Sequence, residues 1–241
     1  MFSYILTYIF FTSLIRFDVD PLLNFGLFSG LIVFFYKYSE YEFFPIENFR
    51  SLPIHKKTYV VTNVVKSSFL LLLCGLSLNT LSYIALPQWN EEQIRYMKNL
   101  GALYSALDFT SIFYNQQMSQ STLLHHLCVL LFFGINYVDA YEKNSVCRLI
   151  MFYAMFSSAS FYVNLVLGLR FILNVPPLAY ALSFVAFLSS TCFNWSVQII
   201  SIMNVSYPKI SLFLYLLSLS FIAVDDIILL RWLWRKSRLP N

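Results

Sequence analysis

Charged residues are scarce in this chain. Asp, Glu, Lys and Arg make up only 12% of its 241 residues, about half of the roughly 25% that is usual in soluble domains. Hydrophobic residues make up 59% of the chain, and the mean hydropathy is +0.65. So few charged side chains cannot cover the surface of a water-soluble domain of this size. The composition therefore predicts an integral membrane protein, and we expect no nucleic-acid partner.

Histidine and cysteine are also rare. The chain has only three histidines, of which His55 lies far in sequence from the pair His125–His126. Membrane desaturases, by contrast, bind metal through repeated histidine clusters. The four cysteines lie within or beside apolar segments and lack metal-binding or redox spacing; they are Cys74, Cys128, Cys147 and Cys192. We therefore expect no metal site, no disulfide framework and no resident cofactor.

What the chain has instead is long apolar segments. A helix needs about 20 residues to cross a bilayer, and several segments approach or exceed that length. We predict an all-α membrane protein with about seven transmembrane helices. The expected spans are Pro21–Phe35, Thr58–Ile84, Asn99–Asn115, Thr122–Val138, Ser145–Leu169, Pro176–Met203 and Ile210–Trp232. The apolar segment Met1–Ile15 is short for a span, and an interfacial helix is the favoured interpretation for it.

Three regions follow from this pattern: an N-terminal part over residues 1–48, a transmembrane domain over 49–232, and a basic tail over 233–241. The positive-inside rule gives the orientation, because one set of loops is richer in Lys and Arg. It predicts that the C-terminus faces the cytosol or the mitochondrial matrix. The richer side holds Lys37, Arg50, Lys56, Lys57, Arg170, Arg231, Arg235, Lys236 and Arg238, and the other side Arg16, Arg95, Lys98, Lys143, Arg148 and Lys209.

Ionisable residues inside the predicted spans mark a candidate site, since such residues usually line a cavity or pathway. At a rise of 1.5 Å per residue, the histidine pair lies about one turn below the inner membrane surface. Asp108 lies roughly 10 Å below that surface and Lys66 roughly 13 Å. The pair Asp225–Asp226 lies within two turns of the surface. We therefore expect a polar cavity that opens on the inner face of the membrane and whose charges neutralise one another.

The residues around the histidine pair form a motif. Asp108-Phe109 lies in one predicted span, and Ser121-Thr122-Leu123-Leu124-His125-His126-Leu127 opens the next. This arrangement resembles the core of the TLC family, which includes TRAM proteins and ceramide synthases. Two weaker similarities flank it. They are Phe49-Arg50-Ser51-Leu52-Pro53-Ile54-His55, and Met155-Phe156-Ser157-Ser158 through Asn164 to Leu169-Arg170. The resemblance covers about residues 49–232 and implies a six-helix core within the seven spans.

The chain departs from the ceramide-synthase pattern at two points. No Thr follows His126 shortly afterwards, and Asp139 and Glu142 are the only acidic residues near the end of that span. Met155 also stands where many family members have a carboxylate. The similarity is therefore closer to the small proteins that consist of a TLC domain alone, and for those it implies a role in membrane lipid composition.

Three functions stay open. The favoured one is binding or handling of an acyl-chain lipid without turnover. The second is acyl transfer from acyl-CoA, with His125 or His126 as nucleophile, the other as general base, and Asp108 orienting the imidazole. The third is a lipid-binding accessory subunit of a large membrane complex. The expected lipid- or substrate-binding residues are Lys66, Asp225, Asp226, Arg170, Lys56, Lys57, Arg235 and Lys236. The endoplasmic reticulum and the mitochondrial inner membrane are the expected locations.

Overall fold

The computed structural model describes residues 13, 15, 19–84, 86, 88–115, 117–141, 145–203 and 209–238. The prediction for Met1–Ile15 therefore falls almost entirely outside the described residues. All regular secondary structure in the described part is helical. The helices are α2 (Pro21–Phe43), α3 (Glu47–Arg50), α4 (Ile54–Leu78), α5 (Leu81–Ile84), α6 (Glu91–Tyr114), α7 (Gln120–Val138), α8 (Val146–Ser158), α9 (Phe161–Leu169), α10 (Pro177–Ile202) and α11 (Lys209–Ser237).

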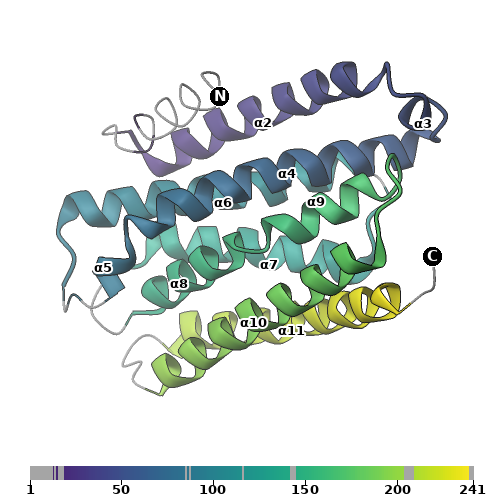
Figure 1. Ribbon diagram of the computed structural model, residues 1–241. Helices are drawn as coiled ribbons and strands as arrows, with labels where there is room; N and C mark the ends of the chain where they lie inside the picture. Colours follow the sequence, from purple (N-terminus) through teal and green to yellow (C-terminus); the bar gives the residue numbers. More distant parts are fainter. Residues whose placement is uncertain are drawn as a thin grey trace.

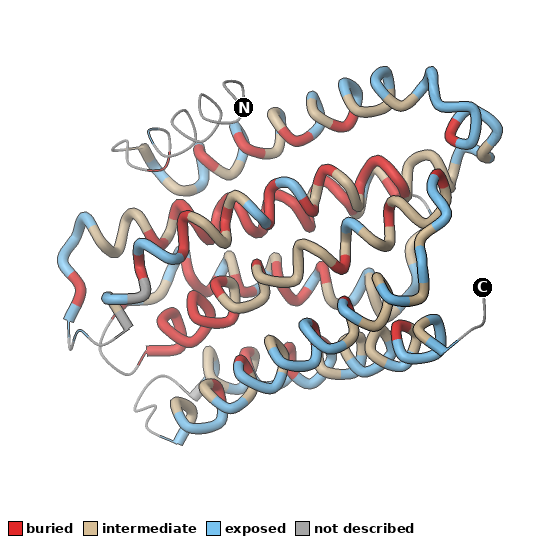
Figure 2. Tube along the Cα trace, viewed as in Figure 1, coloured by how far each residue is buried: buried red, intermediate tan, exposed pale blue. Residues whose placement is uncertain are grey.

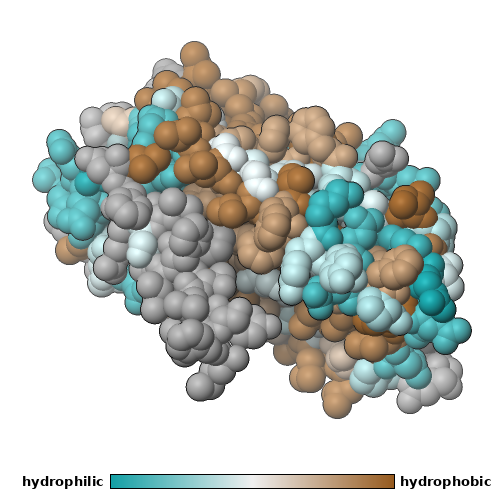
Figure 3. Space-filling model, turned by 90° about the horizontal axis from the view of Figure 1, so that it is seen from above, coloured by the Kyte–Doolittle hydropathy of each residue, from teal (hydrophilic) through white to brown (hydrophobic). Residues whose placement is uncertain are grey.

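The long helices lie side by side and alternate in direction (Figure 1). Helices α4, α6 and α8 run through the middle, where most of the buried residues lie (Figure 2). Helix α2 packs on one side, mainly against α6, and α10 and α11 form the opposite side. On the face shown in Figure 3, apolar residues occupy the centre and hydrophilic residues gather toward the two ends. This distribution is the one expected of a helix bundle that crosses a bilayer.

Five helices in the described residues are long and apolar enough to cross a membrane: α2, α4, α7, α10 and α11. The number becomes six if α8 and α9 together form one span. The structure thus confirms an all-helical membrane protein, but it does not confirm the predicted count of seven. The predicted span that is not among these helices is the one in α6. Helix α6 carries Glu91 and Glu92 in its first turn and Asp108 further along. Because α6 is largely buried among other helices, it does not need an apolar surface facing lipid.

Several predicted boundaries differ from the structure. Helix α2 continues to Phe43 instead of ending at Phe35, and α4 covers Ile54–Leu78 instead of Thr58–Ile84. Helix α6 begins at Glu91 instead of Asn99, and α11 continues to Ser237 instead of ending at Trp232. The predicted span Ser145–Leu169 is also not one straight helix, because α8 and α9 meet at an angle of 46°. Serine side chains at this break bond to nearby backbone carbonyls: Ser158 to Met155 and Ser160 to Ser157, each at 2.6 Å. Such bonds compete with the helical pattern and favour a bend.

Helix α9 packs very closely against α4, and Gly168 permits this approach. A Cβ atom at Gly168 would lie 2.8 Å from Val64 Cγ2 and 3.2 Å from the backbone oxygen of Val60. Only glycine fits without a shift of one helix. The close packing fixes the relative position of the side chains that α4 and α9 direct toward the interior.

Candidate functional site

The start of α7 determines where the histidine pair lies. The Ser119 side chain accepts a hydrogen bond from the backbone N–H of Thr122 at 3.2 Å and so caps the helix. Counted from Gln120, His126 lies about 9 Å along α7. Asp108 lies about the same distance from Tyr114, the last residue of α6. Because α6 and α7 are antiparallel neighbours, the two side chains meet at one depth.

His126, Asp108 and Lys66 form a buried ion-paired cluster. His126 Nδ1 lies 2.7 Å from Asp108 Oδ1, and the side chains of these two residues are 5% and 2% exposed. Lys66 Nζ donates to the same carboxylate oxygen from α4. The cluster therefore joins three helices, and the ammonium group compensates the buried carboxylate. The sequence placed these residues in one membrane leaflet, and the structure brings them into contact.

His125 faces a second carboxylate on α11. Its Nδ1 lies 3.2 Å from Asp225 Oδ2, and each of the two side chains is 16% exposed. Thr122 donates a hydrogen bond to Asp225 Oδ1 at 3.4 Å. Each histidine thus has its own aspartate, from α6 for His126 and from α11 for His125. Asp226 is the next residue on α11, and no basic side chain in the described part of the chain forms an ion pair with it.

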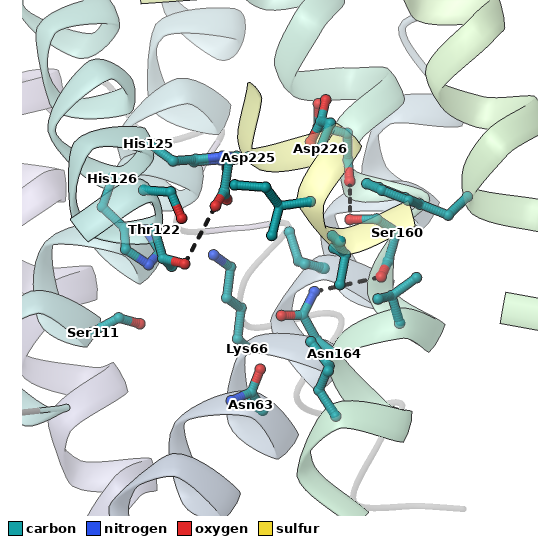
Figure 4. Close-up of a pocket in the computed structure, with 18 of the residues that line it drawn as sticks. Asn63, Lys66, Ser111, Thr122, His125, His126, Ser160, Asn164, Asp225 and Asp226 are labelled. Atoms are coloured by element: carbon teal, nitrogen blue, oxygen red, sulfur yellow. Dashed lines mark hydrogen bonds and ion pairs between the residues drawn. The ribbon is translucent and has the colours of Figure 1, made fainter. Parts of the chain in front are cut away.

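These residues surround a cavity of about 490 Å³ within the bundle. Figure 4 shows Lys66, His125, His126 and Asp225 pointing toward one another on one side, with Ser160 and Asn164 on the other. The cavity reaches the end of the bundle at Tyr59 of α4, Gln117 of the α6–α7 turn and Arg170 of the α9–α10 connection. Apolar side chains line the cavity between the polar groups. They are Leu70 on α4, Val163 and Leu167 on α9, Phe187 on α10, and Ile228, Leu229 and Trp232 on α11.

The predicted site residues divide into two groups. Lys66, His125, His126, Asp225, Asp226 and Arg170 line the cavity, and Asp108 contacts it through its ion pairs. The remaining four basic residues do not line it. The Lys56 ammonium lies over the ring of Phe171 at 5.4 Å and that of Lys57 over the ring of Phe49 at 5.9 Å. Arg235 and Lys236 are exposed on the last turn of α11.

Sequence reasoning missed a set of small polar residues in the cavity wall. Hydroxyl and amide side chains from α8, α9 and α10 line it: Ser157, Ser160, Asn164, Ser190, Thr191 and Asn194. Their spacing carries a signal that can be read in the sequence. Positions 157, 160 and 164 follow one another at spacings of three and four residues, and position 194 comes three residues after 191 and four after 190. Polar residues that recur in this way on apolar helices indicate a face turned toward a polar interior.

The fold and this cavity define the class of protein. The chain is an all-helical integral membrane protein with a charged cavity inside the helix bundle. Comparison with family models, curated proteins and solved structures found no match to the chain.

Each imidazole has a carboxylate oxygen within ion-pair distance of Nδ1, and neither Nδ1 has a hydrogen bond of good geometry. The neighbouring carboxylate favours the tautomer that carries its proton on Nδ1. The other nitrogen, Nε2, then holds a lone pair on the opposite side of the ring. Such an imidazole can accept a proton or attack an electrophilic carbon.

Proposed function

We propose that the protein binds an acyl-chain lipid in the cavity, with the polar part of the lipid at the ionisable residues. The observation that carries the proposal is the composition of the cavity walls. Ionisable groups line the cavity, namely Lys66, the histidine pair and the aspartates, and apolar side chains such as Val163 and Phe187 line it as well. A cavity that offers both charged and apolar contacts matches an amphiphile.

The size of the cavity supports a lipid as the ligand. A volume of about 490 Å³ falls within the range of roughly 300 to 1,000 Å³ that is typical of small-molecule sites. Such a volume accommodates the polar part of a lipid and a portion of one chain. The rest of the lipid then lies along the helices.

The position of the cavity beside lipid-facing helices also supports the proposal. Phe187 and Ser190 of α10 line the cavity, whereas Leu182 and Val185 of the same helix are 62% and 59% exposed on its outer side. One helix layer therefore separates the cavity from the surrounding lipid. A membrane lipid needs to pass only this layer, and a soluble substrate has to enter from the end of the bundle.

Native mass spectrometry of the purified protein tests lipid binding. Ser190 is a half-buried cavity residue, and Ser190→Phe fills part of the cavity. Ser189 is its exposed neighbour on α10 and does not line the cavity, so Ser189→Phe is the matched control. We expect the wild type and Ser189→Phe to retain a lipid, and Ser190→Phe to lose most of it. Equal retention by both variants refutes the cavity as the lipid site.

Acyl transfer is the second candidate function, and the two Asp–His pairs favour it. In such a reaction Nε2 of His125 or His126 attacks the carbonyl carbon of an acyl thioester such as acyl-CoA. The carbon–sulfur bond breaks, and the thiolate leaves and takes up a proton. An amine or hydroxyl then attacks the acyl-imidazole, loses its proton to a base and releases the histidine. The resemblance to the TLC family, including its ceramide synthases, is consistent with this chemistry.

The acyl-enzyme gives this second candidate a direct test. Incubation with a long-chain acyl-CoA should add the mass of one acyl group to the protein, and His125→Asn and His126→Asn identify the histidine that carries it. If no adduct and no acylated product form while lipid is still retained, the function is binding without turnover.

The location and orientation belong to the same proposal. The end of the bundle that the cavity reaches carries Lys56, Lys57, Arg235 and Lys236, which supports a cytosolic or matrix position for that end. The endoplasmic reticulum and the mitochondrial inner membrane both fit. In the accessory-subunit alternative the lipid is structural, and the protein should then migrate in native electrophoresis with an assembly far larger than its 28.2 kDa mass.

A further inference from the structure

Arg170 lies at the mouth of the cavity. It follows the last residue of α9, and it lines the cavity together with Tyr59 and Trp232. The two aspartates of α11 line the same cavity, but no acidic side chain in the described residues forms an ion pair with Arg170. A guanidinium group at a cavity mouth therefore has its charge available to a ligand.

Aromatic rings hold this guanidinium in place. Its central carbon lies 4.5 Å from the ring centroid of Trp232, 4.7 Å from that of Phe171 and 5.3 Å from that of Tyr59. Rings stabilise the cation and restrict its movement, while the N–H groups at the edge of the guanidinium stay available for hydrogen bonds.

Most of these donors lack a partner in the protein. A guanidinium carries five N–H donors. One nitrogen, Nη2, donates to the Tyr59 hydroxyl at 3.4 Å, and the buried Nε has no hydrogen-bond partner. A buried donor without a partner is unfavourable, so the arrangement is more stable when a ligand supplies acceptor oxygens.

The surroundings of Arg170 add positive charge and further polar groups. The Lys56 ammonium lies 5.4 Å from the centroid of the Phe171 ring, which also contacts the Arg170 guanidinium. Asn115, Gln117 and Ser119 line the same mouth. One guanidinium that lines the mouth, a second cation just outside the cavity and several neutral hydrogen-bonding groups suit an anion that has more than one charge and several oxygens, which describes a phosphate better than a carboxylate.

We propose that the mouth of the cavity is a phosphate-binding site centred on Arg170, which holds the phosphate of a ligand whose remaining part extends toward the histidines. This inference rests on the proposed lipid-binding function and adds a chemical class to it. The phosphate belongs either to a lipid headgroup or to a soluble phosphate ester such as coenzyme A.

Two acyl probes that differ only in the phosphate test the site. Lysophosphatidic acid and the monoacylglycerol of the same chain length are titrated into the purified full-length protein in non-ionic detergent, and calorimetry gives both dissociation constants. We expect the phosphate-bearing probe to bind at least about tenfold more tightly, which corresponds to about 1.4 kcal/mol. A free fatty acid of the same length should bind less tightly than lysophosphatidic acid.

Variants assign the preference to Arg170. Arg170→Gln should remove it, and Arg170→Lys, which keeps the charge but loses the planar fork, should keep part of it. Arg231→Gln is the matched control, because Arg231 is exposed on α11 beside Trp232 and does not line the cavity. It should leave the preference unchanged. The comparison of the two probes in the wild type needs no variant, so it holds even if Arg170→Gln fails to fold.

Competition with coenzyme A separates the two sources of phosphate. If coenzyme A displaces lysophosphatidic acid, the site serves a soluble phosphate ester, and if it does not, the site serves a lipid headgroup. Equal binding of the two acyl probes, or full preference in Arg170→Gln, overturns the phosphate site and leaves lipid binding intact. If the wild type binds neither acyl probe, the lipid-binding function itself is wrong.

Discussion

Removing the charge of Asp108 should destabilise the protein strongly. Asp108 binds both Lys66 and His126, and its side chain is 2% exposed. In Asp108→Asn the Lys66 ammonium loses its carboxylate partner in the interior of the bundle. Breaking a buried ion pair in this way costs about 3 to 5 kcal/mol, because the remaining charge is uncompensated.

The expected change in melting temperature follows from this free energy. For a chain of this size, 1 kcal/mol corresponds to about 2 to 4 °C, so Asp108→Asn should lower Tm by about 6 to 20 °C. Intrinsic fluorescence from the four tryptophans reports thermal unfolding in detergent. Glu42→Gln removes an exposed carboxylate and should shift Tm by less than about 2 °C.

A second substitution tests the cause of the loss. Lys66→Met removes the charge that Asp108→Asn leaves without a partner, so the double variant should be more stable than Asp108→Asn alone. A Tm for Asp108→Asn within about 2 °C of wild type, or a double variant less stable than the single one, refutes the view that this ion pair stabilises the fold.

Two further predictions concern packing and hydrogen bonding. Gly168→Ala should destabilise the protein by about 1 to 3 kcal/mol, since the new Cβ lies 2.8 Å from Val64 Cγ2. Gly75→Ala is the control in the same thermal assay. It should be neutral or stabilising, because nothing lies within 4 Å of its Cβ. Tyr215→Phe should cost about 1 kcal/mol, because the Tyr215 hydroxyl bonds to the buried Gln198 side chain, and chemical unfolding should show a decrease in midpoint; an unchanged midpoint contradicts a stabilising role for this bond.

The sequence predicted the helical architecture because apolar segments of membrane length are long and strongly patterned. Prediction from hydropathy was least reliable where a helix is surrounded by other helices of the protein. Helix α6 has charged residues at its beginning and Asp108 within it, and its interior positions such as Leu103 and Leu107 are fully buried. Its place in the centre of the bundle depends on its neighbours, and hydropathy alone carries no information about them.

The histidine and aspartate positions could be placed at a common depth from the sequence, because helical rise gives depth directly. Which aspartate pairs with which histidine could not be predicted from the sequence. Asp108 and Asp225 lie on different helices, and only the packing of α6 and α11 around α7 decides that Asp108 faces His126 and Asp225 faces His125.

For the basic residues near the membrane surface, the sequence predicted more cavity residues than the structure shows. Charge and position grouped Arg170 with Lys56, Lys57, Arg235 and Lys236, but of these only Arg170 lines the cavity. The difference arises from the end of α9, where three aromatic rings hold its side chain. Contacts of this kind join residues far apart in the chain, and a single sequence does not reveal them.

Photolabelling is the most direct test of lipid binding in the cavity. A phospholipid with a photoreactive diazirine in its chain is incorporated into vesicles with the protein and irradiated, and mass spectrometry of peptides locates the labelled residues. If the account is correct, labels appear at cavity residues such as Val163, Phe187 and Leu229 as well as on the outer surface. Labels confined to outward-facing residues such as Leu182 and Val185 contradict it.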